Sequence, residues 1–397
     1  MAVNLSFSPI FIFIMVYDYA IIGAGAGGLH LAQAMLTDEW FVDKKVLILD
    51  KDAKETDDKT WSFWEKGEGK WDHLITQSWD KGVFKTREKT IELELKPYTY
   101  KTLQALEFYK DGKTKIAKAS NFTWIKEEVQ AVESGAIVLI QGTTNQYQAK
   151  QVFDSRIDRK FKEGKDNYYR ILQHFKGWLV ETEKPVFDTS SFVMMDFSIK
   201  WQDTASFTYL LPLTPTSAIV EFTLFTPELI PYDAYDELLT KYLKEELKIE
   251  QYSIAKVEYG VIPMTNYPFE KADKKGITKI GTAGAQVKAS TGYAFKNIER
   301  GSQKIIENLK QQQNPSTGLV KQKYRLIDTL YLDVLTNHND WAETLYTQMY
   351  ERNDIQQIFK FLDDETSILE ELRIMNSLDA GHFLKAVIYH FLGIRIH

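Results

Sequence analysis

Residues 18–28 of the 397-residue chain read DYAIIGAGAGG, and this stretch decides the fold. The apolar run before Gly23 predicts a short β-strand, and helical spacing of apolar residues begins directly after Gly28. Gly23 permits a tight turn out of the strand, Gly25 lets a pyrophosphate approach the backbone, and Gly28 lets the helix pack closely on the sheet. The start of such a helix offers free N–H groups and a positive dipole end to phosphate oxygens. The stretch therefore predicts a dinucleotide-binding turn.

A carboxylate stands at the end of the next predicted strand. Residues 46–50 read VLILD, and Asp50 follows Gly28 by twenty-two positions. A carboxylate in this place accepts hydrogen bonds from the ribose hydroxyls of a dinucleotide and disfavours a 2′-phosphate. Residues 15–55 are thus predicted to bind the ADP half of FAD or NAD rather than NADP, and the structural alternative is a glycine-rich turn without a ligand.

The composition narrows the class of protein. Hydrophobic residues make up 44% of the chain and charged residues 26%, which is typical of a globular protein. The net charge of -6 argues against a nucleic-acid partner. Cysteine is absent, which excludes disulfides, thiolate metal sites and a cysteine nucleophile and is compatible with the cytoplasm; no zinc-binding spacing occurs, and no metal is expected. The aromatic share of 13% suits either a large core or a pocket for a long apolar ligand.

The N-terminus carries an apolar run, IFIFIMV at residues 10–16. The run is shorter than the ~20 residues that span a bilayer. It lacks the charged flank and cleavage site of a signal peptide, so an edge strand or a peripheral membrane contact is expected. A start of translation at Met15 is the other interpretation.

The periodicity of apolar residues divides the rest of the chain into three further regions. Strand patterns at 136–140 and 148–154 predict that residues 120–160, together with 275–300, complete the FAD-binding domain. Residues 56–119 and 161–274 are expected to form the substrate region, in which alternation over 186–225 predicts an antiparallel sheet. Apolar residues at helical spacing predict a helical C-terminal region over 301–397.

Six motifs in one order carry a family resemblance. From about residue 17 to 300, and more weakly beyond, the chain strongly resembles the FAD-dependent lycopene cyclases. The motifs are Asp58–Trp64, Val152–Arg156, Met194–Phe197, Val220–Thr223, Glu258–Met264 and Gly281–Phe295.

The resemblance implies both a fold and an activity. The fold would be α/β, a Rossmann-type FAD-binding fold like that of glutathione reductase, with an interleaved antiparallel-sheet substrate domain and a helical C-terminus. The enzyme would cyclise the ψ ends of lycopene and γ-carotene to β-ionone rings with reduced FAD and no net redox change. NAD(P)H would reduce the flavin. The enzyme would be cytoplasmic and peripherally bound to the membrane that holds its substrate.

The resemblance also implies an acid. Glu221 matches the position of the acid that protonates the substrate, and alternation along its strand turns it to the same face as Ile219 and Thr223. A hydrocarbon offers no hydrogen-bond partners, so we expect an aromatic tunnel in which burial keeps this carboxyl protonated. An exposed edge-strand glutamate is the alternative interpretation. Asp196 would support Glu221 or transfer protons, unless it is an ordinary ion-pair residue, and Glu258 would hold the loop beside the flavin or position substrate.

Thirteen residues are expected to contact the cofactor. They are Gly23, Ala24, Gly25, Gly28, Leu29, Asp50, Trp61, Asp154, Arg156, Gly281, Gly284, Thr291 and Gly292. Two positions depart from the family pattern: Lys59 replaces a usual arginine, and Ala285 replaces a common glycine.

Other functions remain as alternatives. An FAD-dependent monooxygenase or polyprenyl reductase would use the same cofactor fold, although Thr282 stands where hydroxylases of this class usually carry aspartate. A non-catalytic flavin or carotenoid carrier is favoured only if Glu221 is exposed. The sequence is compatible with mono- and bicyclic products, with β and ε rings, with NADH and NADPH as reductant, and with every oligomeric state.

Overall fold

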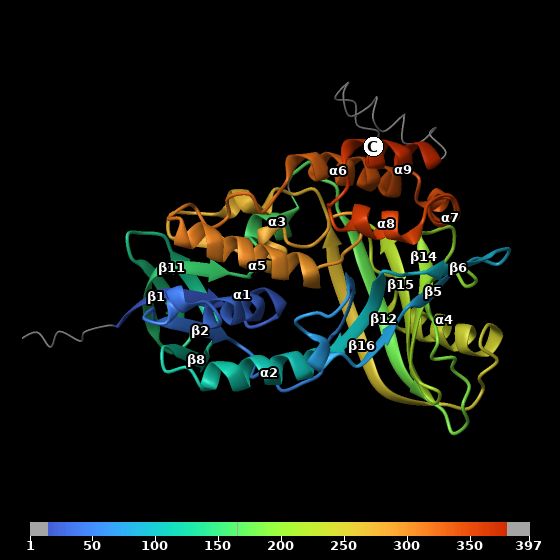
Figure 1. The fold of residues 1–397 in the computed structure, drawn as a ribbon, viewed down its shortest axis with the longest axis horizontal. Helices are drawn as coiled ribbons and strands as arrows, with labels where there is room; N and C mark the ends of the chain where they lie inside the picture. The colour runs from blue at the N-terminus through green and yellow to red at the C-terminus, as the bar shows by residue number, and fades with distance from the viewer. Residues whose placement is uncertain (1–14, 165, 379–397) are drawn as a thin grey trace, which may run out of the picture.

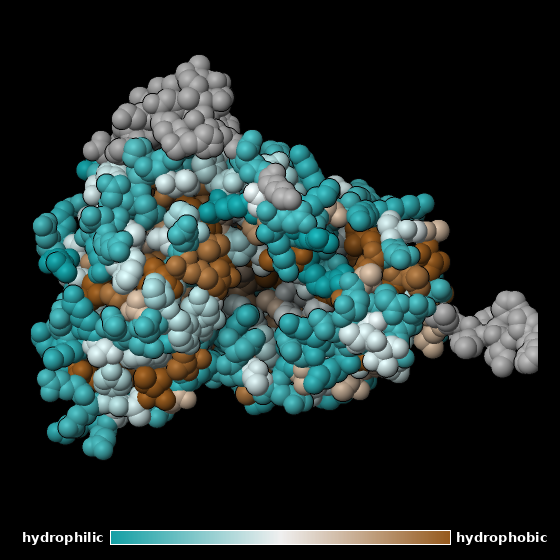
Figure 2. All heavy atoms as spheres, turned by 180° about the vertical axis from the view of Figure 1, so that it is seen from behind, coloured by the Kyte–Doolittle hydropathy of each residue, from teal (hydrophilic) through white to brown (hydrophobic). Residues whose placement is uncertain are grey.

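The computed structural model describes residues 15–164 and 166–378 (Figure 1). Two seven-stranded sheets lie at opposite ends of the molecule, and the C-terminal helices cover the second of them (Figure 1). From behind, the surface is hollowed near its middle, with apolar side chains beside the hollow (Figure 2). The expected edge strand or membrane contact at residues 10–14 lies outside the described residues.

The first sheet contains the strand predicted before the glycine loop. β1 pairs in parallel with β2 on one side and with β11 on the other, and β8 extends the sheet beyond β2. β9 and β10 add antiparallel strands at the far edge, and β17 pairs in parallel with β11. The strands are β1 (Val16–Ile22), β2 (Val46–Asp50), β8 (Phe122–Lys126), β9 (Val129–Glu133), β10 (Val138–Gly142), β11 (Gln146–Asp154) and β17 (Ile277–Lys279).

Side-chain alternation in β1 gives this sheet two cores. Ile21 packs in a cluster with α1 (Ala26–Leu36), while Ile22 packs in a separate cluster on the other face. β2 occupies the predicted residues 46–50, but α1 begins at Ala26, inside the glycine run and earlier than the apolar spacing indicated.

α2 (Ala105–Ala117) was not predicted. It lies within residues 56–119, which were expected to belong to the substrate region, yet it packs against α1 and shares its core. The division of the chain into domains stays a prediction, and this packing favours assigning α2 to the first sheet. The polar pattern at 56–119 hid this helix because only its inner face is apolar.

The second sheet has the strand order β16-β12-β15-β14-β13-β5-β6. α4 (Tyr232–Glu245) covers one face, and its apolar residues form a core with that face. The sheet was expected to be antiparallel, but β13 pairs in parallel with β5, so it is mixed. The bounds are β5 (Lys81–Lys85), β6 (Thr90–Glu94), β12 (Ile171–Glu181), β13 (Phe192–Asp196), β14 (Ser206–Thr214), β15 (Ser217–Thr226) and β16 (Ser253–Met264).

A small sheet joins the two large ones. It is formed by β3 (Thr60–Lys66), β7 (Tyr98–Gln104) and β4 (Gln77–Trp79). Phe63 packs in the core under α1, whereas Tyr100 packs in the core of the second sheet. The short helix α3 (Arg159–Glu163) follows β11.

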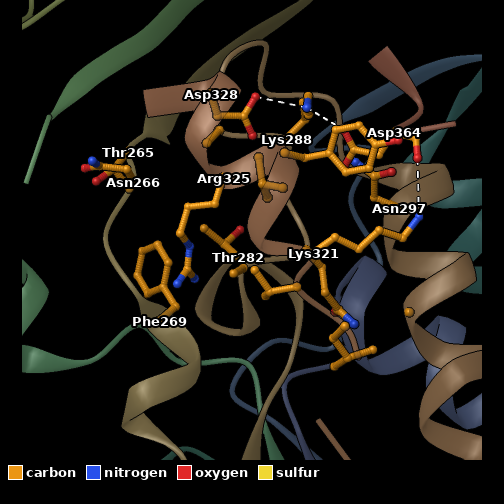
Figure 3. A pocket seen from close by; sticks show the side chains of 18 of the residues that line it. Thr265, Asn266, Phe269, Thr282, Lys288, Asn297, Lys321, Arg325, Asp328 and Asp364 are labelled. Atoms are coloured by element: carbon orange, nitrogen blue, oxygen red, sulfur yellow. Dashed lines mark hydrogen bonds and ion pairs between the residues drawn. The ribbon is translucent and has the colours of Figure 1, made fainter. Parts of the chain in front are cut away.

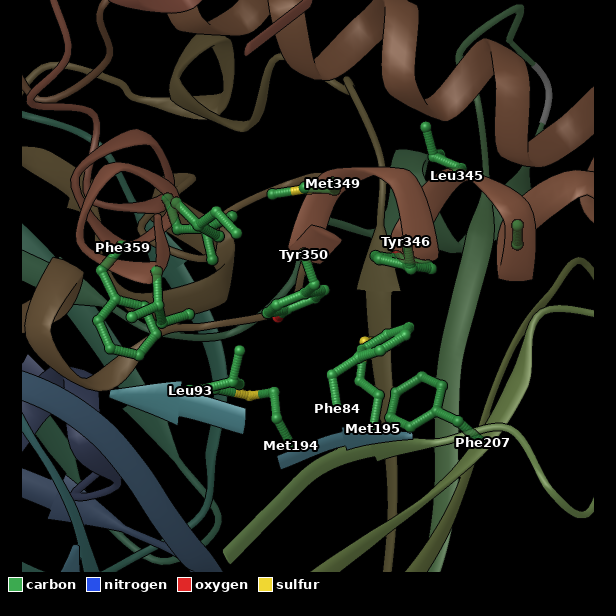
Figure 4. Close-up of a cluster of buried hydrophobic side chains, with 14 of the residues drawn as sticks. Phe84, Leu93, Met194, Met195, Phe207, Leu345, Tyr346, Met349, Tyr350 and Phe359 are labelled. Carbon is green, nitrogen blue, oxygen red and sulfur yellow. The ribbon is translucent and has the colours of Figure 1, made fainter. Parts of the chain in front are cut away.

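The C-terminal region is helical over the described residues, as predicted. α5 (Phe295–Lys310) packs against α1. The others are α6 (Gln322–Asn337), α7 (Ala342–Arg352), α8 (Ile355–Leu362) and α9 (Ile368–Ser377). Figure 4 shows side chains of α7 and α8 above those of the second sheet, with Tyr346 and Tyr350 facing Phe84 and Met195. Among the described residues, no helix combines the length and apolarity needed to cross a bilayer.

Candidate active site

The glycine loop has the geometry that a pyrophosphate requires. Gly23 has φ +94°, a conformation that favours glycine. A Cβ at Gly28 would stand 1.8 Å from the Gly23 carbonyl oxygen, so the helix approaches the strand as closely as predicted. A Cβ at Gly25 would meet nothing within 4 Å, which means that the backbone there faces open space. The loop therefore fits a phosphate group at the start of α1.

Asp50 lies beside this loop at the end of β2. Its carboxylate accepts hydrogen bonds from the backbone N–H of Ala24 at 2.5 Å and of Asp52 at 2.7 Å. Lys54 lies 3.7 Å from the same carboxylate. The acidic group is thus fixed beside the glycine loop, where a ribose would lie if a dinucleotide occupied the loop.

Three residues expected at the cofactor, Leu29, Asp154 and Arg156, make contacts within the protein, and their role at the cofactor stays a prediction. Leu29 is fully buried in the core under α1, and its N–H donates to the Gly25 carbonyl within the helix. Asp154 accepts from Arg156 at 2.9 and 3.0 Å and from Lys279 at 3.0 Å. Burial alone would raise the pKa of Asp154, but these cations lower it. The pair ties the end of β11 to its neighbours, since Arg156 also donates to the Val129 carbonyl.

The second predicted glycine segment lies against the first. A Cβ at Gly27, in α1, would come within 3.1 Å of the Gly281 Cα. The N–H of Gly281 donates to the Gln286 Oε1 at 2.5 Å, which holds the turn. Gly284 also needs to be small, because its Cβ would stand 2.4 Å from the Lys279 carbonyl oxygen.

A largely apolar cavity of about 240 Å³ begins where this segment ends. Thr291 and Gly292 line it, together with Trp61 from β3. The Thr291 hydroxyl is buried and has no hydrogen-bond partner among the described residues. Tyr293, from the segment before α5, also lines the cavity. The second sheet and α6–α8 supply the other walls, mostly with aromatic and aliphatic side chains: Phe175, Phe207, Tyr209, Phe225, Tyr331, Tyr346, Met349, Tyr350 and Phe361.

Glu221 is the carboxyl on this apolar wall. The alternation of β15 turns it into the cavity together with Ile219 and Thr223, as predicted, while Val220 and Phe222 face α4. Burial raises the pKa of Glu221 to about 8, with a further contribution from the charge of Glu258. The Thr223 hydroxyl donates to Glu221 at 2.9 Å and opposes this shift in part. The carboxyl therefore keeps its proton at neutral pH.

Glu258 lies on the same face of the sheet as Glu221. Gly177 of β12 pairs with Glu221 on one side and with Glu258 on the other, so a residue without a side chain separates them. Glu258 accepts from the backbone N–H of Thr60 at 3.0 Å and from its hydroxyl at 2.9 Å. Burial raises the pKa of Glu258, although Thr60 and Lys256 favour its charged form. Its hydrogen bonds therefore join the sheet to the start of β3.

The structure does not place Asp196 beside Glu221. Its pairing with β14 is irregular between Val193 and Asp196, which indicates a bulge, and Asp196 faces α4. There it accepts from the Tyr242 hydroxyl at 2.9 Å and lies 3.2 Å from Lys85. Asp196 is not among the residues that line the cavity. The geometry thus gives it the bonds of a structural ion-pair residue.

Two features of this site gave no local signal in the sequence. One is Gly177, whose place between two acids depends on pairing across three strands. The other is a group of hydroxyls near Glu221: the Tyr100 hydroxyl contacts that of Tyr209 and lies 3.4 Å from that of Tyr293. Tyr293 belongs to a predicted segment, but Tyr100 and Tyr209 come from distant strands.

Known structures share this fold at low sequence identity. A geranylgeranyl bacteriochlorophyll reductase-like protein from Thermoplasma acidophilum is 13% identical, with a TM-score of 0.65 over 95% of this chain and 99% of its own. A single-residue variant of HpxO from Klebsiella pneumoniae, complexed with FAD, is 12% identical, with a TM-score of 0.62 over 92% and 100%. The flavin-dependent brominase Bmp2 is 13% identical, with a TM-score of 0.54 over 95% and 98%. The fold is therefore that of FAD-dependent reductases and monooxygenases.

The sequence itself supplies the family. No curated protein matches the chain. The model of the lycopene cyclase protein family matches residues 18–386, which is most of the sequence. This match spans both the glycine loop and the cavity that holds Glu221. The chain therefore belongs to the lycopene cyclase family.

Proposed function

We propose that this protein is a lycopene β-cyclase that binds FAD and converts the ψ ends of lycopene and γ-carotene to β-ionone rings. The observation that carries the proposal is a buried carboxyl, Glu221, on the wall of an apolar cavity, where burial raises its pKa to about 8. A hydrocarbon substrate needs an acid of this kind, because a polyene is protonated only by a group that holds its proton in a dry site.

The cofactor would be held by the glycine loop and its neighbours. Gly25 and the start of α1 would bind the pyrophosphate, and Asp50 would bind the ribose. Trp61, Thr291 and Gly292 would line the ring on the cavity side, where the unpaired Thr291 hydroxyl supports a polar ligand. When bound, reduced FAD supplies negative charge beside a cationic transition state without net redox change.

Glu221 would begin the reaction. Its carboxyl proton is transferred to C2 of the terminal C1=C2 bond, which leaves a cation at C1. The C5=C6 bond attacks that cation, forms the C1–C6 bond and moves the positive charge to C5. Loss of the C6 proton restores a double bond and closes a β ring, so the product is an isomer of the substrate. Ionised Glu221 would take up that proton, because it is the one carboxylate among the described residues that line the cavity.

The aromatic wall would protect the cation. Tyr209, Tyr293, Tyr346 and Tyr350 line the cavity, and aromatic faces attract a cation by about 0.5–2 kcal/mol each. Burial raises the pKa of each of these tyrosines, so their hydroxyls stay neutral. A largely apolar lining also limits the water that could trap the cation as an alcohol.

The remaining parts of the proposal concern partners and place. NAD(P)H would reduce the flavin, and the protein would be cytoplasmic and bound peripherally to the membrane that dissolves its substrate. Residues 15–55, 120–160 and 275–300 would carry the cofactor, and 56–119 and 161–274 the substrate, with α2 on the cofactor side.

Expression in a bacterial host that accumulates lycopene tests the proposal. The expected result is β- or γ-carotene by pigment chromatography, none with Glu221→Gln, and unchanged yield with Glu237→Gln, an exposed residue of α4 that serves as the matched control. FAD content should be equal in all three proteins. Unchanged lycopene in the presence of FAD-loaded wild-type protein would refute the proposal.

The same host distinguishes a cyclase from the second candidate function, a flavin reductase or monooxygenase. The structures that share the fold favour this second candidate. Such an enzyme would consume one NAD(P)H for each product and would change the mass of lycopene. A cyclase leaves the mass unchanged.

A further inference from the structure

Two cavities adjoin the segment of residues 285–295. The one of about 310 Å³ is lined with ions that pair among themselves: Lys288 lies 2.9 Å from Asp328 and 2.5 Å from Asp364 (Figure 3). A hydrocarbon in that cavity would take water from these ions and return no hydrogen bond. The ψ end of a polyene therefore belongs in the apolar cavity of Glu221, where the polar groups near the acid are hydroxyls.

Four of these hydroxyls meet in one place, which we call the hydroxyl cluster. It consists of Ser62 from β3, Tyr100 from β7, Tyr209 from β14 and Tyr293 from the segment before α5, and all four residues line the cavity. The Tyr100 hydroxyl contacts that of Tyr209 and lies 3.4 Å from that of Tyr293. The Tyr209 hydroxyl also bonds that of Ser62. Four separate parts of the chain thus bring their hydroxyls together.

The hydroxyl cluster lies beside the acid. Tyr209 is the cross-strand partner of Glu221 in the pairing of β14 with β15, and both residues line the cavity. Burial raises the pKa of Tyr209 and of Tyr293, and the charge of Glu221 adds to both shifts. The two hydroxyls therefore stay neutral, and they lie within range of the charges that form when Glu221 gives up its proton.

The hydrogen bonds of the cluster run in one direction. The Ser62 hydroxyl donates to that of Thr102 at 3.0 Å, and the Thr102 hydroxyl donates to the Trp61 carbonyl at 3.4 Å. A carbonyl can only accept, so the chain of hydroxyls ends on it and each hydrogen points toward that end. Tyr209 then donates to Ser62, and Tyr100 donates to Tyr209. Each of these hydrogens is used inside the protein.

Tyr293 completes the pattern. Its hydroxyl donates to the Met194 sulfur at 3.6 Å, so its hydrogen is also used within the protein. A cluster whose hydrogens are all committed has oxygen lone pairs left for a ligand. These lone pairs carry partial negative charge that is in place before the reaction begins, and it acts strongly in an apolar site. Because the chain ends on a carbonyl, which has no hydrogen to pass on, the cluster is suited to electrostatic stabilisation rather than to proton transfer.

We propose that the hydroxyl oxygens of Tyr209 and Tyr293 are catalytic groups that stabilise the substrate cation, with Tyr100 and Ser62 as positioning residues. This role rests on the proposed function and adds an oxygen contact to the ring faces of the aromatic wall. The positive charge, first at C1 and then at C5, would lie between the Glu221 carboxylate and these oxygens. The hydroxyls keep their hydrogens throughout, so the proton still leaves Glu221 for C2 and returns to it from C6.

Steady-state cyclisation of lycopene in liposomes by the FAD-loaded full chain tests this role. Tyr209→Phe and Tyr293→Phe keep a ring face that attracts a cation and remove only the oxygen. Each is expected to lower kcat about tenfold and to change KM less than about twofold, because the oxygen acts on the cation and not on the bound polyene. The control is Tyr98→Phe, the same change in β7 at a buried side chain that is not among the described residues lining the cavity. It should keep the wild-type kcat.

The pH dependence separates this role from a hydrogen bond to the acid. A hydroxyl that donated to Glu221 would favour the charged carboxylate, so its loss would raise the pH above which cyclisation slows, by about one unit. Lone pairs beside Glu221 do not favour its charged form. Tyr209→Phe is therefore expected to leave that pH unchanged or slightly lower, and a rise would overturn the proposal.

Other outcomes would also overturn the proposal. A wild-type kcat in both phenylalanine variants would assign the stabilisation to the rings alone, and an equal loss in Tyr98→Phe would assign it to packing. A higher KM with kcat unchanged would make the hydroxyls substrate-binding groups. If neither phenylalanine variant folds, Ser62→Ala separates the cluster from its terminal carbonyl and should lower kcat about threefold, and an unchanged kcat would then be the contrary result.

The wild type distinguishes this role from the proposed function. A wild-type protein that binds FAD but does not cyclise lycopene rejects the proposed function and this role with it. A wild-type protein that cyclises lycopene, with both phenylalanine variants equally active, rejects only the role of the hydroxyl cluster.

Discussion

Replacing Glu221 with glutamine should make the folded protein more stable at alkaline pH even as it abolishes cyclisation. The side chain stays the same size, and its amide can still accept from Thr223. What disappears is a group whose pKa differs between the folded and unfolded chains. The substitution therefore isolates the part of the free energy of unfolding that depends on the raised pKa of Glu221.

The magnitude follows from the pKa. Burial, reinforced by Glu258, raises the pKa of Glu221 from 4.5 to about 8. Between these values the unfolded chain has released a proton that the folded chain retains, so folded stability is full below the unfolded pKa and falls as pH rises. Each pH unit corresponds to about 1.4 kcal/mol, which gives about 5 kcal/mol at pH 8. Because the groups around a buried carboxyl relax when it ionises, we expect about 3 kcal/mol.

Urea unfolding of FAD-loaded wild type and Glu221→Gln, at pH 5 and pH 8.5, measures this difference. The variant should equal the wild type within about 1 kcal/mol at pH 5 and exceed it by about 3 kcal/mol at pH 8.5. Glu237→Gln, an exposed change of the same kind, should behave as the wild type at both values. A pH dependence that is the same in Glu221→Gln and in the wild type would refute the elevated pKa and with it the acid assignment.

Three further outcomes are expected. Glu258→Gln removes a negative charge that raises the pKa of Glu221. The pH above which cyclisation slows should therefore fall by about one unit, which is the effect of a charge about 10 Å away. Asp196→Asn should lower stability by about 1–3 kcal/mol in urea but leave kcat unchanged, because Asp196 bonds Tyr242 and not the cavity. Gly25→Val should give a folded protein with little bound FAD, whereas Gly28→Val should not fold, as judged by circular dichroism and the flavin spectrum.

The parts of the fold that local patterns specify were predicted from the sequence. β2 ends at Asp50 as expected, because a buried parallel strand is a continuous apolar run. The alternation around Glu221 gave the correct face, since a strand turns every second side chain to the same side. The family resemblance added the proposal that Glu221 is the acid, which no periodicity contains.

The parts that depend on distant pairing were not predictable. Asp196 follows Met194 and Met195 in an apolar frame, but a bulge in the pairing with β14 turns it toward α4. The parallel pairing of β13 with β5 joins residues more than a hundred positions apart. Leu29 is adjacent to the glycine loop in sequence, yet the helix rotates its side chain into the core.

Hydrogen bonds and an ion pair through β16 connect the sheet that carries Glu221 to the helices that pack beside the glycine loop. Glu258 accepts from Thr60, and its neighbour Lys256 lies 2.5 Å from Asp57. Asp57 in turn accepts from the N–H of Leu106 in the first turn of α2, which packs against α1 behind the glycine loop. Glu258 therefore acts on Glu221 in two ways, by its charge and by holding the sheet to the cofactor side. Glu258→Gln removes the charge but keeps an acceptor for Thr60, whereas Glu258→Ala removes both. If FAD affinity falls in the alanine variant and not in the glutamine variant, the hydrogen bonds to Thr60 couple the sheet to the cofactor side.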